Sequence, residues 1–418
     1  MSSNENIRLA YRNIKRNTGS KTAGTDNLTI KDICYLSVED VINTVQTMFK
    51  SYKPQMVRRV FIDKGNGKLR PLGIPTIWDR IFQQCILQVL GPICEAKFHK
   101  HSYGFRPNRS THHAKARFEF LINQAGLHHC VDVAKKGFFD NVDHIWMMEF
   151  LKLRIADHNI LRIIGKFLKG GYMEEGKKYK THNGTPQGGV ISPVLANVYL
   201  HYALDLWFEK KVKKQCKGQA YVVRYADDFV CCFQYQSEAQ EFFQSLKFRL
   251  KKFNLEIAED KTKIIPFGRF AEKYEKQKGN SKPATFDFLG FTHYCGKSKQ
   301  GKFRMKRKSS RKKVQGKLKE SKEWLKKNRN KDIHMIMDRF RRSLIGYYNY
   351  YCITDNTQNV SNFKDKIENL LFKWLNRRSQ RKSFTWDKFR LFLDKYPLPS
   401  PRIKVNIYDL RKEINYIL

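Results

Sequence analysis

In RYADDFVCC, residues 224–232, two adjacent carboxylates, Asp227 and Asp228, stand between apolar runs. The runs AYVV before it and FVCCF within and after it predict two short strands joined by a tight turn. Turns are rich in aspartate, so the pair alone is weak evidence for a site. Two like charges flanked by buried strands would be costly without a cation, and Mg²⁺ is the cation that suits carboxylate oxygens. The stretch therefore predicts a hairpin whose turn binds Mg²⁺ through Asp227 and Asp228.

A second stretch, HHCVDVA at residues 128–134, predicts a short strand, and the segment after FFD (138–140) predicts a helix. Residues 57–75 alternate apolar and polar positions on both sides of a Gly-rich tip and predict a β-hairpin with basic residues at its tip. Apolar residues at three- and four-residue spacing predict an amphipathic helix over residues 77–98. This order of helices and strands predicts an α+β domain with helices on one face of a sheet.

The charge of the chain is extreme. Its 418 residues include 81 Lys and Arg against 39 Asp and Glu, for a formal net charge of +42. Such a charge destabilises a compact protein by self-repulsion unless a polyanion balances it, which indicates a nucleic-acid-binding protein. A merely soluble basic protein is the alternative. Hydrophobic residues at 41% and aromatic residues at 13% exclude wholesale disorder.

Basic residues concentrate after residue 295, with seventeen Lys or Arg and two Glu between Lys297 and Lys331. Val314, Leu318 and Leu325 lie at helical spacing, so part of this run predicts an amphipathic helix with a basic outer face. Further on, aromatic residues and arginines alternate. They could form only a solvated face, but aromatic rings beside cations also suit stacked bases and phosphates. The candidate nucleic-acid-binding residues are Arg307, Arg311, Lys312, Lys313, Arg341, Arg342, Tyr347, Tyr348, Arg377 and Arg378.

Cysteine usage and hydropathy indicate the cellular compartment in which the protein is expected. The nine cysteines form no C-x-x-C pair, and no run of eighteen apolar residues could cross a membrane. We therefore expect a soluble protein of a reducing cytoplasm with no membrane partner.

Several motifs in a fixed order give the chain a family resemblance. It resembles a bacterial group II intron-encoded reverse transcriptase–maturase, and the resemblance covers essentially the whole chain. The matching segments are AYRNIKRNTGSKTAGTD (10–26), FIDKGNGKLRPLGIPTIWDR (61–80), HSYGFRPNRS (101–110), GFFDNVDH (137–144), GTPQGGVISPVLANVYLH (184–201), RYADDFV (224–230), LEIAEDKTKI (255–264), FDFLGFTHY (286–294), GYYNYY (346–351) and WLNRRSQRKS (374–383).

The resemblance implies a fold and a domain order. We expect an α+β right-hand polymerase with an antiparallel palm sheet, followed by an α-helical thumb and maturase region. Residues 1–120 would form an N-terminal extension and fingers, and 121–295 the palm with part of the fingers. Residues 296–355 would form the helical thumb or maturase (X) domain, and 356–418 a basic helical region for maturase or nucleic-acid binding.

The resemblance also implies roles for individual residues. Lys64 and Arg70 would grip the incoming triphosphate. Phe139 would lie under the sugar and exclude a ribose 2′-hydroxyl, although core packing alone could also explain a phenylalanine there. Two further nucleotide-binding candidates are Gln187 and Lys261, the latter a weak assignment beside Lys263. The glycines around Gln187 would let the backbone approach template and nucleotide.

Downstream, the resemblance assigns the grip on the primer 3′ end to Phe288, Leu289 and Gly290. The implied partners are group II intron RNA, an RNA template/DNA primer duplex, target DNA and dNTP.

One position departs from the family pattern. The family carries an aspartate five residues before the sugar-gating aromatic, and that position is Ala134, followed by Lys135. Asp132 points to the same face of the strand but lies roughly 6.6 Å away along it, too far to replace a ligand without a bulge or register slip. Ala134 therefore predicts an impaired two-metal site. It could be a laboratory substitution in an intact enzyme or a natural loss.

Three functions are consistent with these observations. The first is an RNA-directed DNA polymerase and splicing maturase that copies intron RNA by two-metal nucleotidyl transfer. The second is a non-catalytic RNA-binding splicing factor on the same scaffold. A related retroelement or host-defence reverse transcriptase is a third, against which the long basic tail argues.

Overall fold

The hairpin predicted around Asp227 and Asp228 is present in the computed structural model of the chain. Strands β7 (Ala220–Tyr225) and β8 (Asp228–Phe233) pair in antiparallel register and leave a two-residue loop. The predicted strand at 128–134 is β3 (His129–Val133), which pairs antiparallel with β8. With β10 (Lys263–Pro266) at the edge, the sheet order is β10-β3-β8-β7.

The structure describes residues 1–63, 69–133, 135–185, 188–260, 262–380 and 384–412. The chain divides into two compact units. The first comprises residues 1–64, 68–114 and 129–264, and the second comprises 65–67, 115–128 and 265–418. Each unit is described separately below.

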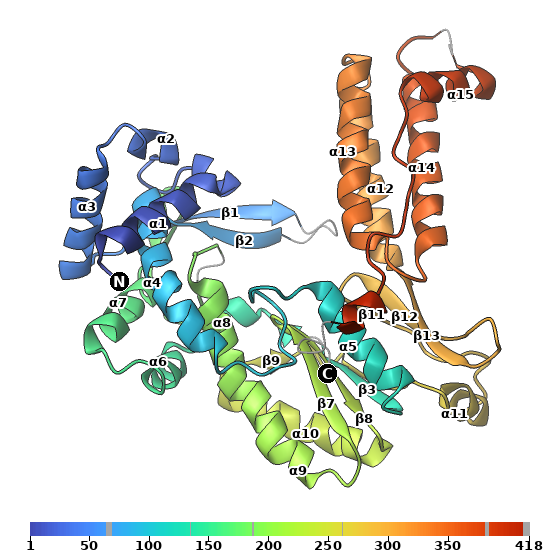
Figure 1. Cartoon of the computed structure of the whole chain (residues 1–418), viewed down its shortest axis with the longest axis horizontal. Helices are drawn as coiled ribbons and strands as arrows, with labels where there is room; N and C mark the ends of the chain where they lie inside the picture. Colours follow the sequence, from blue (N-terminus) through green and yellow to red (C-terminus); the bar gives the residue numbers. More distant parts are fainter. Residues whose placement is uncertain (64–68, 134, 186–187, 261, 381–383, 413–418) are drawn as a thin grey trace. The chain divides into compact units, whose positions relative to one another are not determined.

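The first unit carries helices on the face of the β3-β8-β7 sheet (Figure 1). Its helices are α1 (Asn4–Arg16), α2 (Ile30–Ile33), α3 (Val38–Lys50), α4 (Ile77–Glu95), α6 (His144–Lys152), α7 (His158–Leu168), α8 (Ser192–Leu200), α9 (Lys213–Gln215) and α10 (Gln236–Lys252). Between α8 and α9 the backbone continues as π-helical turns at His201–Asp205 and Phe208–Val212. Helix α5 (Thr111–Asn123) starts in this unit and continues into the second.

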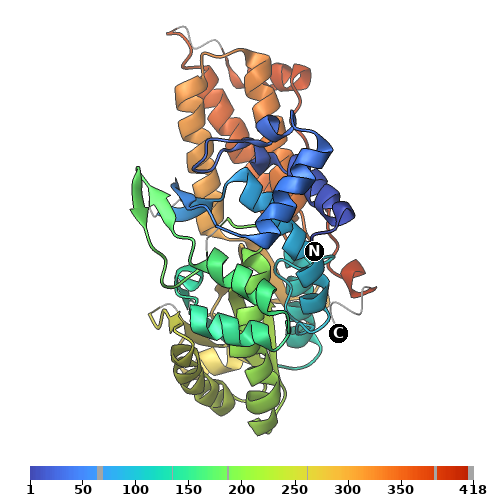
Figure 2. The ribbon, with the colours of Figure 1, turned by 90° about the vertical axis from the view of Figure 1, so that its left-hand side faces the viewer.

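A second sheet in the first unit contains the predicted hairpin at 57–75. Strands β1 (Val57–Asp63) and β2 (Leu69–Ile74) pair antiparallel, and β5 (Tyr172–Glu174) and β6 (Lys177–Tyr179) extend the sheet in the order β2-β1-β5-β6. The β5–β6 hairpin beside β1 is visible in Figure 2. A short pair, β4 (Lys135–Lys136) with β9 (Glu256–Ile257), completes the strands of this unit in the described residues.

The core of the first unit is apolar and well filled. Phe82 of α4, Leu195 of α8 and Phe229 of β8 are all at most 1% exposed and belong to one hydrophobic cluster. Burying such side chains stabilises the fold by ~1.5–3 kcal/mol each. The helices and the sheet that carries the carboxylate turn therefore share one core.

The second unit combines a three-stranded antiparallel sheet with helices. The sheet order is β11-β12-β13, from Phe286–Phe288, Phe291–Lys297 and Phe303–Ser309. The helices are α11 (Ala271–Gln277), α12 (Arg311–Asn328), α13 (Ile333–Tyr351), α14 (Thr357–Leu375) and α15 (Trp386–Lys395). The predicted basic amphipathic helix is α12, with Leu325 buried and Val314 and Leu318 packed against the same core. The prediction of mixed α and β structure with a helical C-terminal region is confirmed.

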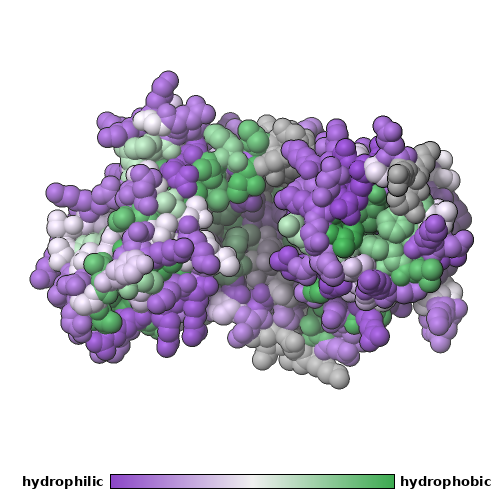
Figure 3. All heavy atoms as spheres, turned by 90° about the horizontal axis from the view of Figure 1, so that it is seen from above, coloured by the Kyte–Doolittle hydropathy of each residue, from purple (hydrophilic) through white to green (hydrophobic). Residues whose placement is uncertain are grey.

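The surface agrees with the composition. Much of the face in Figure 3 is hydrophilic, with hydrophobic patches between. In the part of the chain that the structure describes, no helix is both long and apolar enough to span a membrane.

A lysine lies inside the second unit. Lys115 is 0% exposed, and its Nζ lies 3.9 Å from the ring centre of Phe291 and 4.6 Å from that of Tyr350. The charge of Arg307 acts on Lys115, and Arg307 itself pairs with Glu119, with Nη2 2.9 Å from Oε2. Burial and, to a lesser extent, the charge of Arg307 hold the pKa of Lys115 well below its ordinary value.

This burial predicts a pH dependence of stability. The unfolded chain binds a proton at Lys115 that the folded chain lacks, so the free energy of unfolding should rise with pH from the lowered folded pKa to the ordinary pKa near 10.5. One proton corresponds to ~1.4 kcal/mol per pH unit. Urea unfolding across the alkaline range measures the slope, and Lys115→Met should flatten it. An equal slope in both proteins would contradict the assignment.

Candidate functional site

The carboxylates lie at a strained two-residue turn. Tyr225 pairs with Asp228, and Ala226 and Asp227 form the loop between them. Ala226 has φ +55°, a left-handed conformation that favours glycine. Asp227 is half-buried and Asp228 is exposed. The turn thus presents oxygen ligands at the end of a buried sheet.

The end of β3 runs beside this turn. Val133, the last described residue of β3, pairs with Phe229, which is adjacent to Asp228. Asp132 pairs with Val230, two residues from Asp228. At about 3.3 Å per residue, this register agrees with the expected offset of Asp132 from the turn. The two segments named from the sequence therefore meet in one sheet.

A buried arginine, Arg224, holds the backbone of the turn. Arg224 is 0% exposed and donates a hydrogen bond to the Ala226 carbonyl at 2.8 Å. The same guanidinium donates to both carboxylate oxygens of Asp205, at 2.8 and 2.5 Å, and to Asn197 Oδ1 at 3.0 Å. Burial alone would raise the pKa of Asp205, but the charge and hydrogen bonds of Arg224 lower it. The pair is thus ionised and holds the loop backbone at a fixed position. We call Arg224, Asp205 and Asn197 the buried triad.

One continuous helical segment supplies both side-chain partners of the Arg224 guanidinium. Asn197 and Asp205 are eight residues apart, and π-helical backbone carries Asp205. Such turns recur at functional sites because they redirect side chains. Asn197 thus links α8 to the arginine that holds the turn.

The HSYGF segment at residues 101–105 lies against the turn. The Tyr103 amide donates to the Arg224 carbonyl at 2.8 Å, and the Arg224 amide donates to the His101 carbonyl at 3.0 Å. A Cβ on Gly104 would lie 2.2 Å from the Ala226 nitrogen, so no side chain fits at 104 without moving the turn. Asn197 Nδ2 also donates to the Gly104 carbonyl at 2.8 Å.

A small cavity lies next to Phe139, the predicted sugar-gating residue. Its volume is about 150 Å³, and Arg59, Phe139 and Gly184 are among its lining residues. The Thr185 amide donates to the Phe139 carbonyl at 2.8 Å. Arg59 stacks on Tyr172 with its guanidinium carbon 3.2 Å from the ring centre. Phe139 is half-buried, whereas its neighbour Phe138 is in the core, so Phe139 can face a ligand.

The glycines of GTPQGG serve the chain's own backbone. A Cβ on Gly184 would lie 2.9 Å from the carbonyl oxygens of Phe139 and Asp140, and one on Gly188 would lie 2.3 Å from the Gly73 oxygen. Both have positive φ, +91° and +122°. These contacts with β2 and the 139–140 turn already require glycine at both positions, and the approach of template and nucleotide stays a prediction.

Four predicted site residues, Lys64, Ala134, Gln187 and Lys261, lie outside the described residues. Arg70 is described and exposed on β2, opposite Ile62 of β1. Among the described residues, no group of three or more His, Cys, Asp or Glu side chains could hold a metal ion.

The predicted primer-grip residues form a tight turn in the second unit. Phe288 pairs with Phe291, leaving Leu289 and Gly290 as a two-residue loop with φ +48° and +78°. Positive φ at both positions matches the hairpin turn that fits the twist of the strands. Tyr350 Oη donates to the Leu289 carbonyl at 2.8 Å, and the Ser310 amide donates to the Gly290 carbonyl at 3.0 Å. Phe288 is 3% exposed, so the half-buried Leu289–Gly290 loop is the more accessible part of this turn.

The prediction of nucleic-acid binding is wrong for three residues, Arg307, Tyr347 and Tyr348. Arg307 is 0% exposed and paired with Glu119, so no phosphate can reach it. Tyr347 stacks on Phe363 with ring centres 4.0 Å apart, and Tyr348 Oη donates to the Pro399 carbonyl. Both tyrosines are less than 10% exposed and belong to the helical core.

The other predicted residues are accessible. Arg311, Lys312 and Lys313 are exposed in the first turn of α12, where cations oppose the positive end of the helix dipole. Arg342 is exposed and forms an ion pair with Asp338 at 2.7 Å, whereas Arg341 is half-buried. Arg377 and Arg378 are exposed after α14.

Comparison with known proteins assigns both parts of the chain. Residues 62–293, more than half of its length, match the reverse transcriptase (RNA-dependent DNA polymerase) family, and residues 311–392 match the group II intron maturase-specific domain. The chain is 40% identical over 206 residues to the group II intron-encoded protein LtrA of Lactococcus lactis, covering 49% of this chain and 34% of LtrA. It is 34% identical over 241 residues to protein YkfC of Escherichia coli, covering 51% of this chain and 63% of YkfC.

A putative COX1/OXI3 intron 1 protein of Saccharomyces cerevisiae is 32% identical over 214 residues, covering 51% of this chain and 25% of the yeast protein. The chain thus spans less than two thirds of the length of each of these relatives. With both matches in order along the sequence, the chain belongs to the reverse transcriptase family and also carries a segment that matches the group II intron maturase-specific domain.

Proposed function

We propose that the chain is built as an RNA-directed DNA polymerase and intron maturase, with residues 1–120 and 121–295 as fingers and palm. Residues 296–355 and 356–418 are then the thumb and maturase regions. The observation that carries this proposal is the register of β3, β8 and β7, which brings the strand end at Val133 beside the Asp227–Asp228 turn. The copied template is RNA, and group II intron RNA is the splicing substrate.

Asp227 and Asp228 offer hard oxygen ligands at an accessible turn, which suits Mg²⁺. When bound, a pair of such ions activates the primer 3′-hydroxyl and stabilises the departing pyrophosphate. The family's third ligand position is Ala134, whose methyl group has no oxygen to donate. The chain as written is therefore impaired in synthesis, while its substrate-binding residues remain.

The remaining roles follow the same proposal. Lys64 and Arg70 bind the triphosphate, and Phe139 faces the sugar beside its cavity. Gln187 and Lys261 contact the nucleotide. The Leu289–Gly290 loop after Phe288 holds the primer end, with its backbone fixed by Tyr350.

Replacing Asp227 tests which residues carry synthesis. In a chain restored with Ala134→Asp, Asp227→Asn should return primer extension on an RNA template to background, because a metal ligand is lost. Asp365→Asn is the matched control, since Asp365 is exposed on α14 in the second unit and belongs to none of the proposed site residues. Full synthesis by the Asp227→Asn protein would contradict the proposal.

A non-catalytic RNA-binding splicing factor is the second candidate, favoured by Ala134 together with the maturase-specific match at 311–392. It predicts intron splicing that survives Asp227→Asn in a normally folded chain. Splicing that collapses in that variant would contradict this candidate alone.

Both candidates need a basic RNA-binding surface, and the first turn of α12 can be tested directly. The triple variant Arg311→Gln, Lys312→Gln, Lys313→Gln should weaken RNA binding and reduce the slope of log affinity against log salt by about 2, at ~0.7 per phosphate contact. The free energy of unfolding should not fall, because the positive end of the helix dipole repels cations in the first turn, and the variant removes three of them. Filter binding at several salt concentrations measures the slope. Arg307→Gln should instead lower stability, because it takes away the arginine cation that pairs with the buried Glu119.

A further inference from the structure

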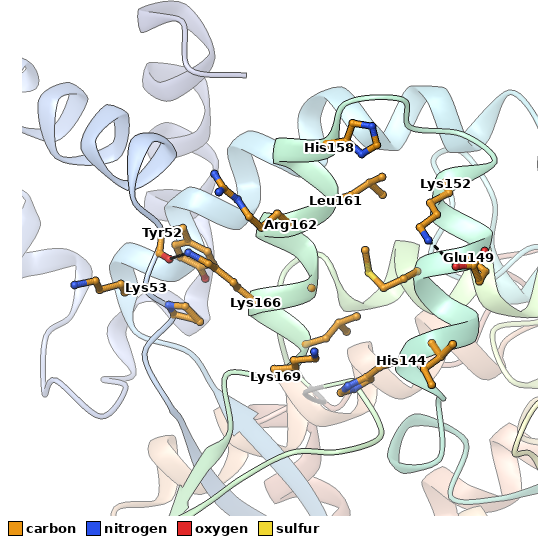
Figure 4. Close-up of a pocket in the computed structure, with 15 residues that line it drawn as sticks. Tyr52, Lys53, His144, Glu149, Lys152, His158, Leu161, Arg162, Lys166 and Lys169 are labelled. Carbon is orange, nitrogen blue, oxygen red and sulfur yellow. Dashed lines mark hydrogen bonds and ion pairs between the residues drawn. The ribbon is translucent and has the colours of Figure 1, made fainter.

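A separate pocket of about 820 Å³ lies between helices α6 and α7 in the first unit (Figure 4). The two helices run in opposite directions, with His144 and Lys169 at one end and Lys152 and His158 at the other. The segment Tyr52–Pro54 closes one side. Its size is in the range of roughly 300–1,000 Å³ typical of ligand pockets. None of the predicted site residues lines it.

The floor of the pocket is apolar and open because of a glycine. Met148, Leu161 and Leu168 line it, and Gly165 lies at the middle of α7. A glycine inside a helix is unfavourable relative to alanine. A Cβ at this position would meet only Met148, at 3.9 and 4.0 Å, which is ordinary contact. Packing within the described residues thus does not require glycine here, whereas an open floor does.

The rim of the pocket is cationic. The face of α7 toward the pocket carries His158, Arg162 and Lys166 at helical spacing, and Lys169 follows directly after the helix. Lys53 and Lys152 add two further cations, and Glu149 is the acidic residue of the lining. Glu149 is paired with Lys152 at 2.6 Å. The lining has five Lys or Arg and one Glu, so its net charge is +4 with histidines neutral.

Some of the rim is already fixed by the fold. Lys166 Nζ donates to the Tyr52 carbonyl at 2.9 Å, and His144 Nε2 contacts the Gly184 carbonyl at 2.7 Å. Lys53, Arg162 and Lys169 are exposed at the mouth of the pocket, and Arg162 donates to Asn159 Oδ1 at 3.2 Å. These three cations are the ones best placed to meet a ligand.

We infer that this pocket binds a single-stranded RNA segment, with an unstacked base on the apolar floor and flanking phosphates on the cationic rim. An apolar floor with a cationic rim matches a nucleotide, which joins a flat aromatic base to an anion. A duplex does not fit, because its bases are stacked inside. The inference rests on the proposed function only in taking RNA as the partner, and it concerns a site apart from the carboxylate turn.

The test uses photocross-linking on the chain as written. A short single-stranded RNA with one internal 4-thiouridine is irradiated with the protein, and the cross-linked peptides are identified by mass spectrometry. We expect cross-links in 144–152 or 158–169. Gly165→Leu, which fills the floor without removing charge, should lower the yield of those cross-links about tenfold.

Two further variants separate the floor from the rim. Arg162→Gln with Lys169→Gln should reduce the salt slope of binding by about 1.4, at ~0.7 per phosphate. Lys210→Gln with Lys211→Gln removes two exposed cations elsewhere in the same unit and should leave the pocket cross-links unchanged. Gly165→Ala controls for folding and should raise the denaturation midpoint.

The outcomes are decisive in either direction. Cross-links that map elsewhere, or pocket cross-links that persist in Gly165→Leu, overturn the inference. Displacement of the RNA from the pocket by polyglutamate but not by unlabelled RNA also overturns it, in favour of an acidic protein partner. Because no synthesis is measured, failure of the proposed polymerase function would leave this result unaffected.

Discussion

Ala134→Asp should raise RNA-templated primer extension on the order of 10³-fold or more over the chain as written. The new carboxylate follows Val133, whose strand already pairs with β8 beside the turn, so the third oxygen ligand returns to the strand that the family uses. A 10³-fold change corresponds to ~4 kcal/mol of transition-state stabilisation. Primer extension with labelled primer and Mg²⁺ measures the gain.

The matched control is Ala134→Asn, because the asparagine side chain has nearly the same shape as aspartate but no charge. Primer extension by this variant should stay near that of the unaltered chain, since the ligand must neutralise a divalent cation. A restored chain that gains nothing would show that position 134 is not the missing ligand. A gain by both variants would indicate an effect on folding, which urea unfolding of the two proteins would reveal.

The second large effect concerns the buried triad. Arg224→Gln leaves the Asp205 carboxylate fully buried without its cation, so we expect a loss of stability of about 3–5 kcal/mol. In the Ala134→Asp background it should also reduce synthesis about 10²-fold, because the Ala226 carbonyl loses its donor and the carboxylates shift. Urea unfolding and steady-state extension kinetics measure the two effects.

A double variant separates positioning from stability. Arg224→Met with Asp205→Leu removes both charges and should recover most of the lost stability, since apolar replacement of a buried ion pair is often neutral. Synthesis should stay low, with the loss mainly in kcat, because nothing then holds the Ala226 carbonyl. Recovery of both properties would mean that the triad only stabilises the fold.

The sequence was sufficient for the elements that local periodicity defines. Alternation around Asp227 and Asp228 predicted β7 and β8, and the spacing of Val314, Leu318 and Leu325 predicted α12. Local periodicity identifies an element without its partners. Nothing near Arg307 indicated Glu119, which is 188 residues away in sequence and pairs with it only in the folded chain.

The two tyrosines were predictable from a signal that was misread. Phe340, Leu344, Tyr347 and Tyr348 lie at three- and four-residue spacing on α13, which is the pattern of a buried stripe. Interleaved arginines suggested a binding face, but the tyrosine rings pack in the core.

The buried triad also left a trace in the sequence. Asn197 and Asp205 are polar residues eight apart within the otherwise apolar SPVLANVYLHYALDLWF, so they had to be satisfied inside the fold. Their partner could not be identified, because any of several arginines was available. The contact of Gly104 with Ala226 had no sequence signal beyond a glycine in a loop.

The contact between Gly104 and Ala226 determines whether the carboxylate hairpin can be transferred to another protein. Its loop conformation is imposed by backbone from 101–104 and by a guanidinium anchored on a distant helix, rather than by the loop's own residues. A peptide of residues 220–233, or the same hairpin grafted onto a foreign sheet, should relax to another turn. The smallest transplantable module is therefore three discontinuous segments, and directed recombination of such enzymes should keep all of them from one parent.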